Sequence, residues 1–260
     1  MEREANNRGP TGEGAERTTT VAAAKATLRG CFAHTWLLLA LACLCGGAAP
    51  AAAQSDPAHA LKASSQAAGI ASLPTAAQSA ISAAIGRDRS DYRAQPTSNG
   101  GFGMVNSEGR LNVEFAQGGV VVRVGDPKGA GWNLALEGYG RGGSMNLVSS
   151  AAPQADANRV AYHHGGLTEW YVNGPLGLEQ GFTLTRPPGL PEGYADQPLT
   201  IVLALSGGLT ASLDSAGTGL TLKQHDGQAV LHYTGLSAQD AAGELLKCWL
   251  ELHGSQLRCH

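Results

Sequence analysis

From residue 111 onward, apolar and polar residues alternate with a period of two. Clear examples are 111–115 (LNVEF), 132–137 (WNLALE) and 199–205 (LTIVLAL), where every second residue is large and apolar. Successive side chains of a β-strand point to opposite faces, so the alternation predicts strands with one buried and one exposed face. Turn residues such as Gln117-Gly118-Gly119 separate the segments at short intervals. The pattern predicts an all-β fold, an antiparallel β-sandwich over 101–260.

Turn dipeptides predict how some of these strands pair. Asp226-Gly227 is typical of a two-residue hairpin, and Gly254-Ser255 predicts a last hairpin between Trp249–Leu252 and Gln256–Cys259. The first hairpin predicts four cross-strand pairs, which are Leu222 with Leu231, Leu220 with Tyr233, Thr221 with His232 and Lys223 with Val230. This register puts the apolar residues of both strands on one face.

The segment Leu167–Leu184 (LTEWYVNGPLGLEQGFTL) concentrates aromatic residues in a chain that has few. Its alternation places Trp170 and Val172 on one face, and Leu167, Glu169 and Tyr171 on the other. Asn173-Gly174 predicts a turn. Pro175 has no backbone N–H, so we expect an edge or a bulge there.

One short helix is predicted before the strands, within a helix-and-linker region over 74–100. Pro74, Thr75 and Gln78 have the spacing of a capping box, and Gly86 predicts the C-terminal stop. The apolar stripe is narrow, so we expect a lightly packed lid over one end of a sheet. Its residues are Ala77, Ala80, Ile81, Ala84 and Ile85.

Residues 1–53 are predicted to be a signal peptide, and 54–73 a flexible tether. Lys25 and Arg29 precede a short apolar core, Trp36–Cys45, and 51–53 (AAA) offers a signal-peptidase site. The core falls far short of the ~20 residues that span a bilayer, so we favour a cleaved leader over a membrane anchor. A lipoprotein signal at Cys43 lacks the expected upstream leucine. The leader is long enough that we expect translation to begin downstream of Met1, near Val21.

Composition agrees with export to the extracellular space or cell surface. Only 15% of residues are charged, 36 are glycine and the net charge is −3. No basic run is dense enough for a nucleic-acid backbone, so we expect no nucleic-acid partner. Outside the leader only Cys248 and Cys259 remain, and they could form a disulfide. The predicted last hairpin sets Cys259 opposite Leu250, which favours two small apolar positions instead.

Several motifs offer chemistry, and each has a simpler structural interpretation. Glu169 and Glu179 could be the paired carboxylates of a secreted glycoside hydrolase, which need a separation of roughly 5–9.5 Å. His163-His164 suggests a metal, but adjacent strand residues point to opposite faces. Residues 138–143 (GYGRGG) resemble a phosphate loop but precede no helix, so we predict a long glycine-rich turn. No G-x-S-x-G motif is present. We therefore expect no catalytic residues, no metal site and no cofactor.

Three segments carry a resemblance to a known family: 158–184, 198–222 (PLTIVLALSGGLTASLDSAGTGLTL) and 229–243 (AVLHYTGLSAQDAAG). They resemble the N-terminal β-sandwich region of bacterial exported proteins that continue into FG-GAP or similar β-propeller repeats. The most specific part is 170–182 (WYVNGPLGLEQGF), and the similarity extends from Thr75 to the end. It implies a non-catalytic module at the head of a surface repeat array. In those proteins a further strand, an Asp-Pro junction and the propeller follow, so we expect this chain to be C-terminally truncated.

Two functions from different classes follow. The first is an exported structural or adhesive module that binds a surface glycan or protein, with Trp170, Tyr171, Glu169, Glu179 and the loop Pro187–Pro198 as contacts. The alternative is the hydrolase that uses Glu169 and Glu179. In the first, Trp170 and Tyr171 have a competing role as packing residues, because large aromatic side chains are usually buried.

Overall fold

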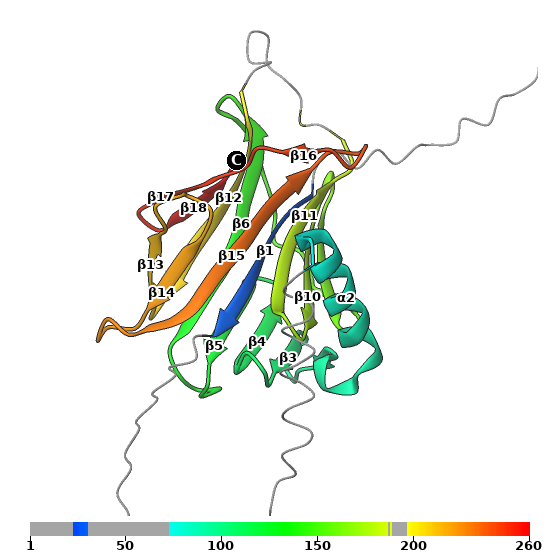
Figure 1. Ribbon diagram of the computed structural model, residues 1–260, viewed down its shortest axis with the longest axis vertical. Coiled ribbons are helices and arrows are strands. Elements are labelled where there is room, and N and C mark those ends of the chain that lie inside the picture. Colours follow the sequence, from blue (N-terminus) through cyan, green and yellow to red (C-terminus); the bar gives the residue numbers. More distant parts are fainter. Residues whose placement is uncertain (1–22, 31–72, 187, 189–196) are drawn as a thin grey trace, which may run out of the picture.

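The computed structural model describes residues 23–30, 73–186, 188 and 197–260, with the backbone alone for 23–30 and 75–76. These residues form two antiparallel sheets and one α-helix (Figure 1). The predicted all-β fold is confirmed.

Sheet A has nine strands among the described residues, eight of them in the order β13-β14-β15-β1-β11-β10-β9-β8, with β16 paired to β15. Their bounds are β13 Thr210–Leu213, β14 Leu220–Lys223, β15 Ala229–Gln239, β1 Ala23–Gly30, β11 Gly177–Leu184, β10 Leu167–Gly174, β9 Arg159–His164, β8 Gln154–Asp156 and β16 Leu245–Leu246.

Sheet B also has nine described strands, in the order β17-β18-β12-β6-β5-β4-β3-β2, with β7 paired to β6. Their bounds are β17 Leu250–His253, β18 Gln256–Cys259, β12 Leu199–Gly207, β6 Gly131–Arg141, β5 Gly119–Val124, β4 Leu111–Ala116, β3 Phe102–Asn106, β2 Gln95–Pro96 and β7 Ser144–Leu147.

The two sheets pack face to face over a single apolar core. Two edge-to-face aromatic pairs cross from one sheet to the other: Phe115 with Tyr171 at 5.2 Å between ring centroids, and Trp132 with Tyr233 at 6.1 Å. All four rings are almost fully buried. The alternating apolar residues of both sheets thus meet in the middle, which makes the fold a β-sandwich.

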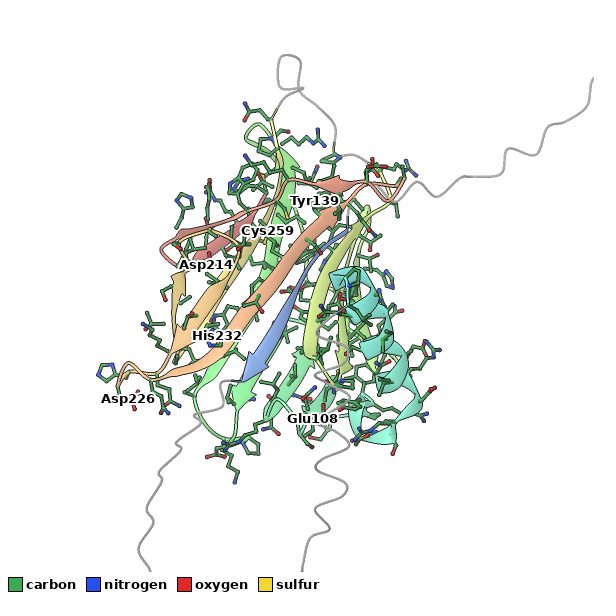
Figure 2. The ribbon with its side chains drawn as sticks, in the orientation of Figure 1. Glu108, Tyr139, Asp214, Asp226, His232 and Cys259 are labelled. Carbon is green, nitrogen blue, oxygen red and sulfur yellow. The ribbon has the colours of Figure 1, made fainter. Side chains whose placement is uncertain are left out.

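The predicted register of the β14–β15 hairpin is confirmed for three pairs, and the fourth is wrong. Lys223 pairs with Ala229 rather than Val230, after a register shift that follows Leu222. The loop runs over 224–228, where Gln224 N–H donates to the Gln228 carbonyl, so it is longer than two residues. Asp226 lies at its tip, away from the core (Figure 2).

The last hairpin forms as predicted, with Leu250 opposite Cys259 and the turn at Gly254-Ser255. Cys248 and Cys259 are both free thiols. Burial raises the pKa of Cys259 to about 12, so its thiol stays neutral and packs as a small apolar side chain.

Two turn predictions were wrong. The β10–β11 hairpin turns at Pro175-Leu176, since Gly174 pairs with Gly177 and Asn173 with Leu178. Proline suits such a turn because its φ is fixed and its missing N–H is not needed there. The predicted glycine-rich turn over 138–143 is mostly strand, because β6 continues to Arg141 and only Gly142-Gly143 turn into β7.

Helix α2 (Thr75–Asp88) forms, but three of its predicted details were wrong. Gln78 donates to the Leu73 carbonyl instead of completing a capping box, and Gly86 lies inside the helix. The predicted apolar stripe is not the buried face: among the described side chains of the helix Ser82 and Gly86 are buried, whereas Ala80, Ile81 and Ala84 are exposed. The helix lies on β10 (Figure 1), and a β-carbon at Gly86 would fall 2.1 Å from the Asn173 carbonyl oxygen. Close approach of two backbones, not helix termination, requires this glycine.

Strand β1 falls inside the predicted signal peptide. It lies between β11 and β15 and is antiparallel to both, with Leu28 opposite Leu178 on one side and Tyr233 on the other. The leader prediction itself remains a prediction. Within the described part of the chain, no helix is long and apolar enough to cross a membrane.

Candidate functional site

A cluster of polar side chains lies in the apolar core around Glu169, which is 5% exposed. Glu169 Oε1 accepts hydrogen bonds from the Tyr171 hydroxyl at 2.6 Å and from Gln180 Nε2 at 3.0 Å. Gln180 Oε1 in turn accepts from the Tyr233 hydroxyl at 3.2 Å. We call Glu169, Tyr171, Gln180, Tyr233 and His164 the polar core cluster. A carboxylate this deep is costly unless its oxygens are bonded, and one of them has two partners.

The register of β10 and β11 brings the cluster together. Tyr171 lies opposite Gln180, and Glu169 lies opposite Phe182, so all of them point to the core face. The predicted split of the segment is confirmed: Leu167, Glu169 and Tyr171 face the core, while Trp170 faces away. Alternation alone had already placed a carboxylate on an apolar face.

His164 supplies the charge that faces Glu169. Its Nδ1 lies 3.2 Å from the Ser149 carbonyl oxygen, which can only accept, so Nδ1 carries a proton. Its Nε2 lies 3.8 Å from Glu169 Oε2, and both side chains are 6% exposed. The Glu169 carboxylate raises the pKa of His164, against an opposing effect of burial. A doubly protonated imidazole facing a carboxylate is the arrangement that this geometry favours.

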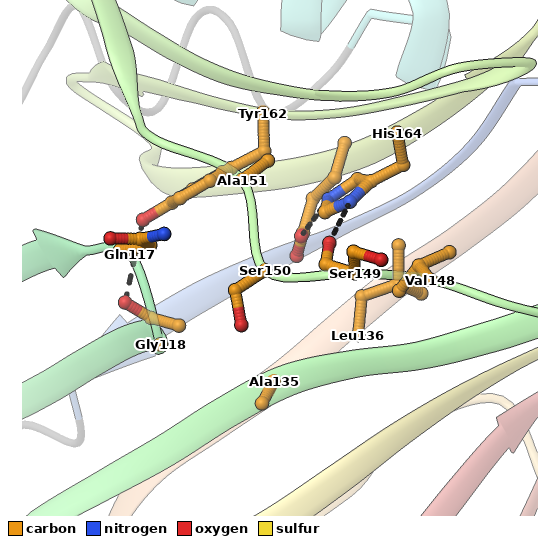
Figure 3. Close-up of a pocket in the computed structure, with 12 residues that line it drawn as sticks. Gln117, Gly118, Ala135, Leu136, Val148, Ser149, Ser150, Ala151, Tyr162 and His164 are labelled. Carbon is orange, nitrogen blue, oxygen red and sulfur yellow. Dashed lines mark hydrogen bonds and ion pairs between the residues drawn. The ribbon is translucent and has the colours of Figure 1, made fainter.

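A cavity of about 100 Å³ adjoins this pair. Tyr162, His164 and the 148–151 segment line it, together with Glu169 and parts of 117–119 and 135–136 (Figure 3). The Tyr162 hydroxyl donates to the Ala116 carbonyl at 3.1 Å. A water takes up about 30 Å³ in the liquid, so the cavity has room for a few waters. Pockets for organic ligands usually measure about 300–1,000 Å³.

Tyr171 and Tyr233 of the cluster, and Tyr162 beside it, are held neutral. Burial is the main cause that raises the pKa of Tyr162, Tyr171 and Tyr233 well above the ordinary value. Each hydroxyl can donate a hydrogen bond, but because it stays protonated it cannot act as a phenolate base. The cluster therefore has the properties of a buried hydrogen-bond network more than those of acid–base machinery.

Glu179 lies on the opposite face of sheet A. It pairs with Val172 across the β10–β11 ladder, one residue out of phase with the core-facing positions. On that face Arg159 lies 4.7 Å over the Trp170 ring, and Trp170 Nε1 donates to Thr183 Oγ1 at 3.1 Å. The nearby Glu179 carboxylate opposes the lowering of the Arg159 pKa by burial. The backbone of sheet A thus separates Glu169 from Glu179.

The predicted binding residues therefore do not form one surface. Tyr171 is fully buried in the core, and Trp170 is only 9% exposed. Gly181 lies under the Trp170 ring, where a β-carbon would fall 2.1 Å from an indole carbon. Of the loop Pro187–Pro198, only 188, 197 and 198 belong to the described residues.

His163 and His164 point away from each other. His163 Nδ1 lies 3.2 Å from Thr168 Oγ1 and is exposed, while His164 faces the core. Among the described residues, no group of three or more His, Cys, Asp or Glu could hold a metal ion.

An asparagine network was not foreseen from the sequence. Asn173, fully buried, donates to the Tyr92 and Val105 carbonyls at 3.1 and 2.9 Å and accepts from Asn106 Nδ2 at 2.8 Å. Asn158 Nδ2 bonds the Asn173 and Ala83 carbonyls at 2.6 and 3.1 Å. The network ties α2, β3 and β10 together. The available signal was the recurrence of asparagine at strand ends, which is too common to be specific.

A surface groove of about 570 Å³ lies beside the cluster. It is lined by 147–152, Gln154 and 163–165, and it includes Leu147, which is 84% exposed. The segment 148–151 and His164 line both this groove and the inner cavity. This surface, rather than Trp170, is accessible to a partner.

No protein-family model, curated protein or solved structure matches this chain.

Proposed function

We propose that this chain is a non-catalytic β-sandwich module of an exported protein, which heads a surface repeat array and contacts a surface glycan or protein. The observation that carries the non-catalytic part is the separation of Glu169 and Glu179 by the backbone of sheet A. Paired glycosidase carboxylates must flank one bond, so both must project into the same cleft at a separation of roughly 5–9.5 Å. Glu169 and Glu179 therefore do not supply the paired carboxylates that the hydrolase alternative requires.

The chemistry around Glu169 supports the same proposal. One carboxylate oxygen is held by Tyr171 and Gln180, and the other faces His164. The adjoining cavity of about 100 Å³ is smaller than the pockets that usually hold organic ligands, so it offers little room for a sugar beside the carboxylate. Export and the repeat array rest on the leader pattern and on the family resemblance.

The contact surface that fits this role best is the groove at 147–152 and 163–165. It combines an exposed leucine with polar backbone and histidine groups, so it offers a ligand both an apolar contact and hydrogen-bonding partners. Trp170 and Tyr171 support the sandwich from within.

The test is to screen the purified full chain on a panel of polysaccharides for binding and for release of reducing ends. We expect no turnover, and expect any binding to fall when Leu147 is changed to Asp while Leu245→Asp, at another exposed leucine, leaves it unchanged. Turnover that disappears in both Glu169→Gln and Glu179→Gln would overturn the proposal. Export is tested separately, by fusing residues 1–53 to a periplasmic reporter and sequencing the N-terminus of the product.

A further inference from the structure

The place of β1 in sheet A points to a second binding site, which goes beyond the proposed function. β11 and β15 are far apart in sequence, and neither pairs with the other; β1 lies between them and pairs with β11 over 23–28 and with β15 over 23–30. Figure 1 shows β1, in blue, in the middle of the sheet. β1 belongs to the predicted leader, and the predicted cleavage after Ala53 would separate it from the rest of the chain.

We propose that the slot between β11 and β15 is a strand-acceptor site, and that after processing it binds an extended segment of a partner chain by β-augmentation. Removing one strand from the middle of a sheet leaves two facing rows of unpaired backbone N–H and C=O groups. An extended peptide restores both ladders at once, and its side chains provide the specificity.

The core face of the slot selects small or short apolar side chains. Position 28 of β1 lies opposite Leu178 and Tyr233, and positions 26 and 24 lie opposite Gln180 and Phe182. The hydrogen bond from Tyr233 to Gln180 joins the two flanking strands, which are roughly 10 Å apart at the usual strand spacing. It crosses the core face of whichever strand fills the slot. This limited space favours small residues at positions 24 and 26 of an occupying strand.

The outer face of the slot favours basic residues. Glu179 lies opposite position 27, so a basic residue at position 25 or 29 of an occupying strand would be its diagonal neighbour. Ser237, Thr234 and His232 line the β15 side of the same face. The preferred partner is therefore a strand of about eight residues that alternates small apolar with basic or polar residues.

The experiment starts from the folded full chain, with a site-specific protease sequence inserted after Ala53. After cleavage, a fluorescent peptide of residues 21–32 is added, and its uptake is followed by anisotropy while hydrogen exchange reports on β11 and β15. We expect saturable exchange with residues 1–53 and restored amide protection in both strands. A peptide with Leu28→Asp should bind at least about 100-fold more weakly, since it places a charge opposite two buried residues.

Two further measurements make the result specific. Glu179→Gln in the acceptor should weaken the peptide several-fold and reduce its salt dependence, whereas Glu114→Gln, on sheet B, should not. Release of residues 1–53 with unchanged protection of β11 and β15 and no peptide uptake would overturn the proposal, because the slot would have closed. Dimers that exclude the peptide would also overturn it, in favour of a second copy as the occupant. Neither outcome bears on whether the module is catalytic.

Discussion

At the scale of single residues, the buried asparagines and glycines are the most constrained positions of this molecule. They act through close contacts and through hydrogen bonds that no other side chain reproduces. Asn173 alone bonds two backbone carbonyls and a second asparagine, which join three separate elements.

Asn173→Ala should destabilise the protein by roughly 2–4 kcal/mol, because a buried group that loses its partner costs about 1–3 kcal/mol and more than one is affected. Urea denaturation followed by circular dichroism measures the change. Asn133→Ala removes an exposed bond to Ser206 and is the control, expected within about 0.5 kcal/mol of the parent. Equal effects of the two substitutions would contradict the network.

Gly181→Ala should cost about 1–3 kcal/mol, the usual penalty for overpacking, because the added carbon would overlap the Trp170 ring. A shift of the tryptophan emission toward that of exposed indole should accompany it. Gly118→Ala, where no atom lies within 4 Å of the added carbon, serves as the control. If Gly181→Ala changed neither the stability nor the tryptophan emission, the Trp170 ring could not lie against Gly181.

His164 should make stability depend on pH. Its pKa is raised in the folded state, so its contribution is fully present below the unfolded value of about 6.5 and is lost as pH rises through the folded pKa. Burial lowers the pKa of His260, so the contribution of His260 to stability changes with pH in the opposite direction. The measured quantity is therefore the difference in unfolding free energy between parent and His164→Gln, from pH 5 to 9. It should shrink toward high pH, and a difference that stays constant from pH 5 to 9 would contradict the pairing of His164 with Glu169.

At the scale of elements, local pattern predicted strands well and missed what depends on tertiary pairing. The alternation in 199–205 and the turn at Gly254-Ser255 are short-range signals, and both formed as expected. β1 could not be foreseen, since AAKATLRG has little β-propensity and its order comes from two neighbours distant in sequence. Only part of the polar core cluster could be predicted from the sequence. Alternation placed Glu169 on the same face as Leu167 and Tyr171, but its partners Gln180 and Tyr233 could be identified only from the pairing of the strands.

Helix α2 contacts the sheet through small residues, so its docking should be sensitive at one position. Gly86→Ala should loosen the helix although alanine is the better helix former by about 1 kcal/mol, because the Asn173 carbonyl leaves no room. Hydrogen exchange of the α2 amides should then quicken while the β10 amides stay protected. Ala84→Leu, on the exposed side, should change neither. An unchanged helix in the Gly86 variant would refute this packing.

At the scale of the whole molecule, one core joins both sheets, and Cys259 offers a native probe of its integrity. Its thiol is buried and its pKa lies near 12, so alkylation requires the sandwich to open. Pulse alkylation with peptide mapping in increasing urea should label Cys259 only along the global unfolding curve. Labelling of Cys259 at low denaturant would mean that the β17–β18 hairpin opens separately from the rest.

β10 is covered on both sides, by the sandwich core on one and by α2 with the Arg159–Trp170 stack on the other. A strand enclosed in this way has no permissive side. In a deep mutational scan, tolerance to polar replacements should therefore not alternate along 169–174, as it would along an ordinary surface strand, but should be uniformly low. Substitutions that accumulate in this protein should therefore fall mainly in strands with one solvent-exposed face. The sequence of β10 should change more slowly than the sequences of those strands.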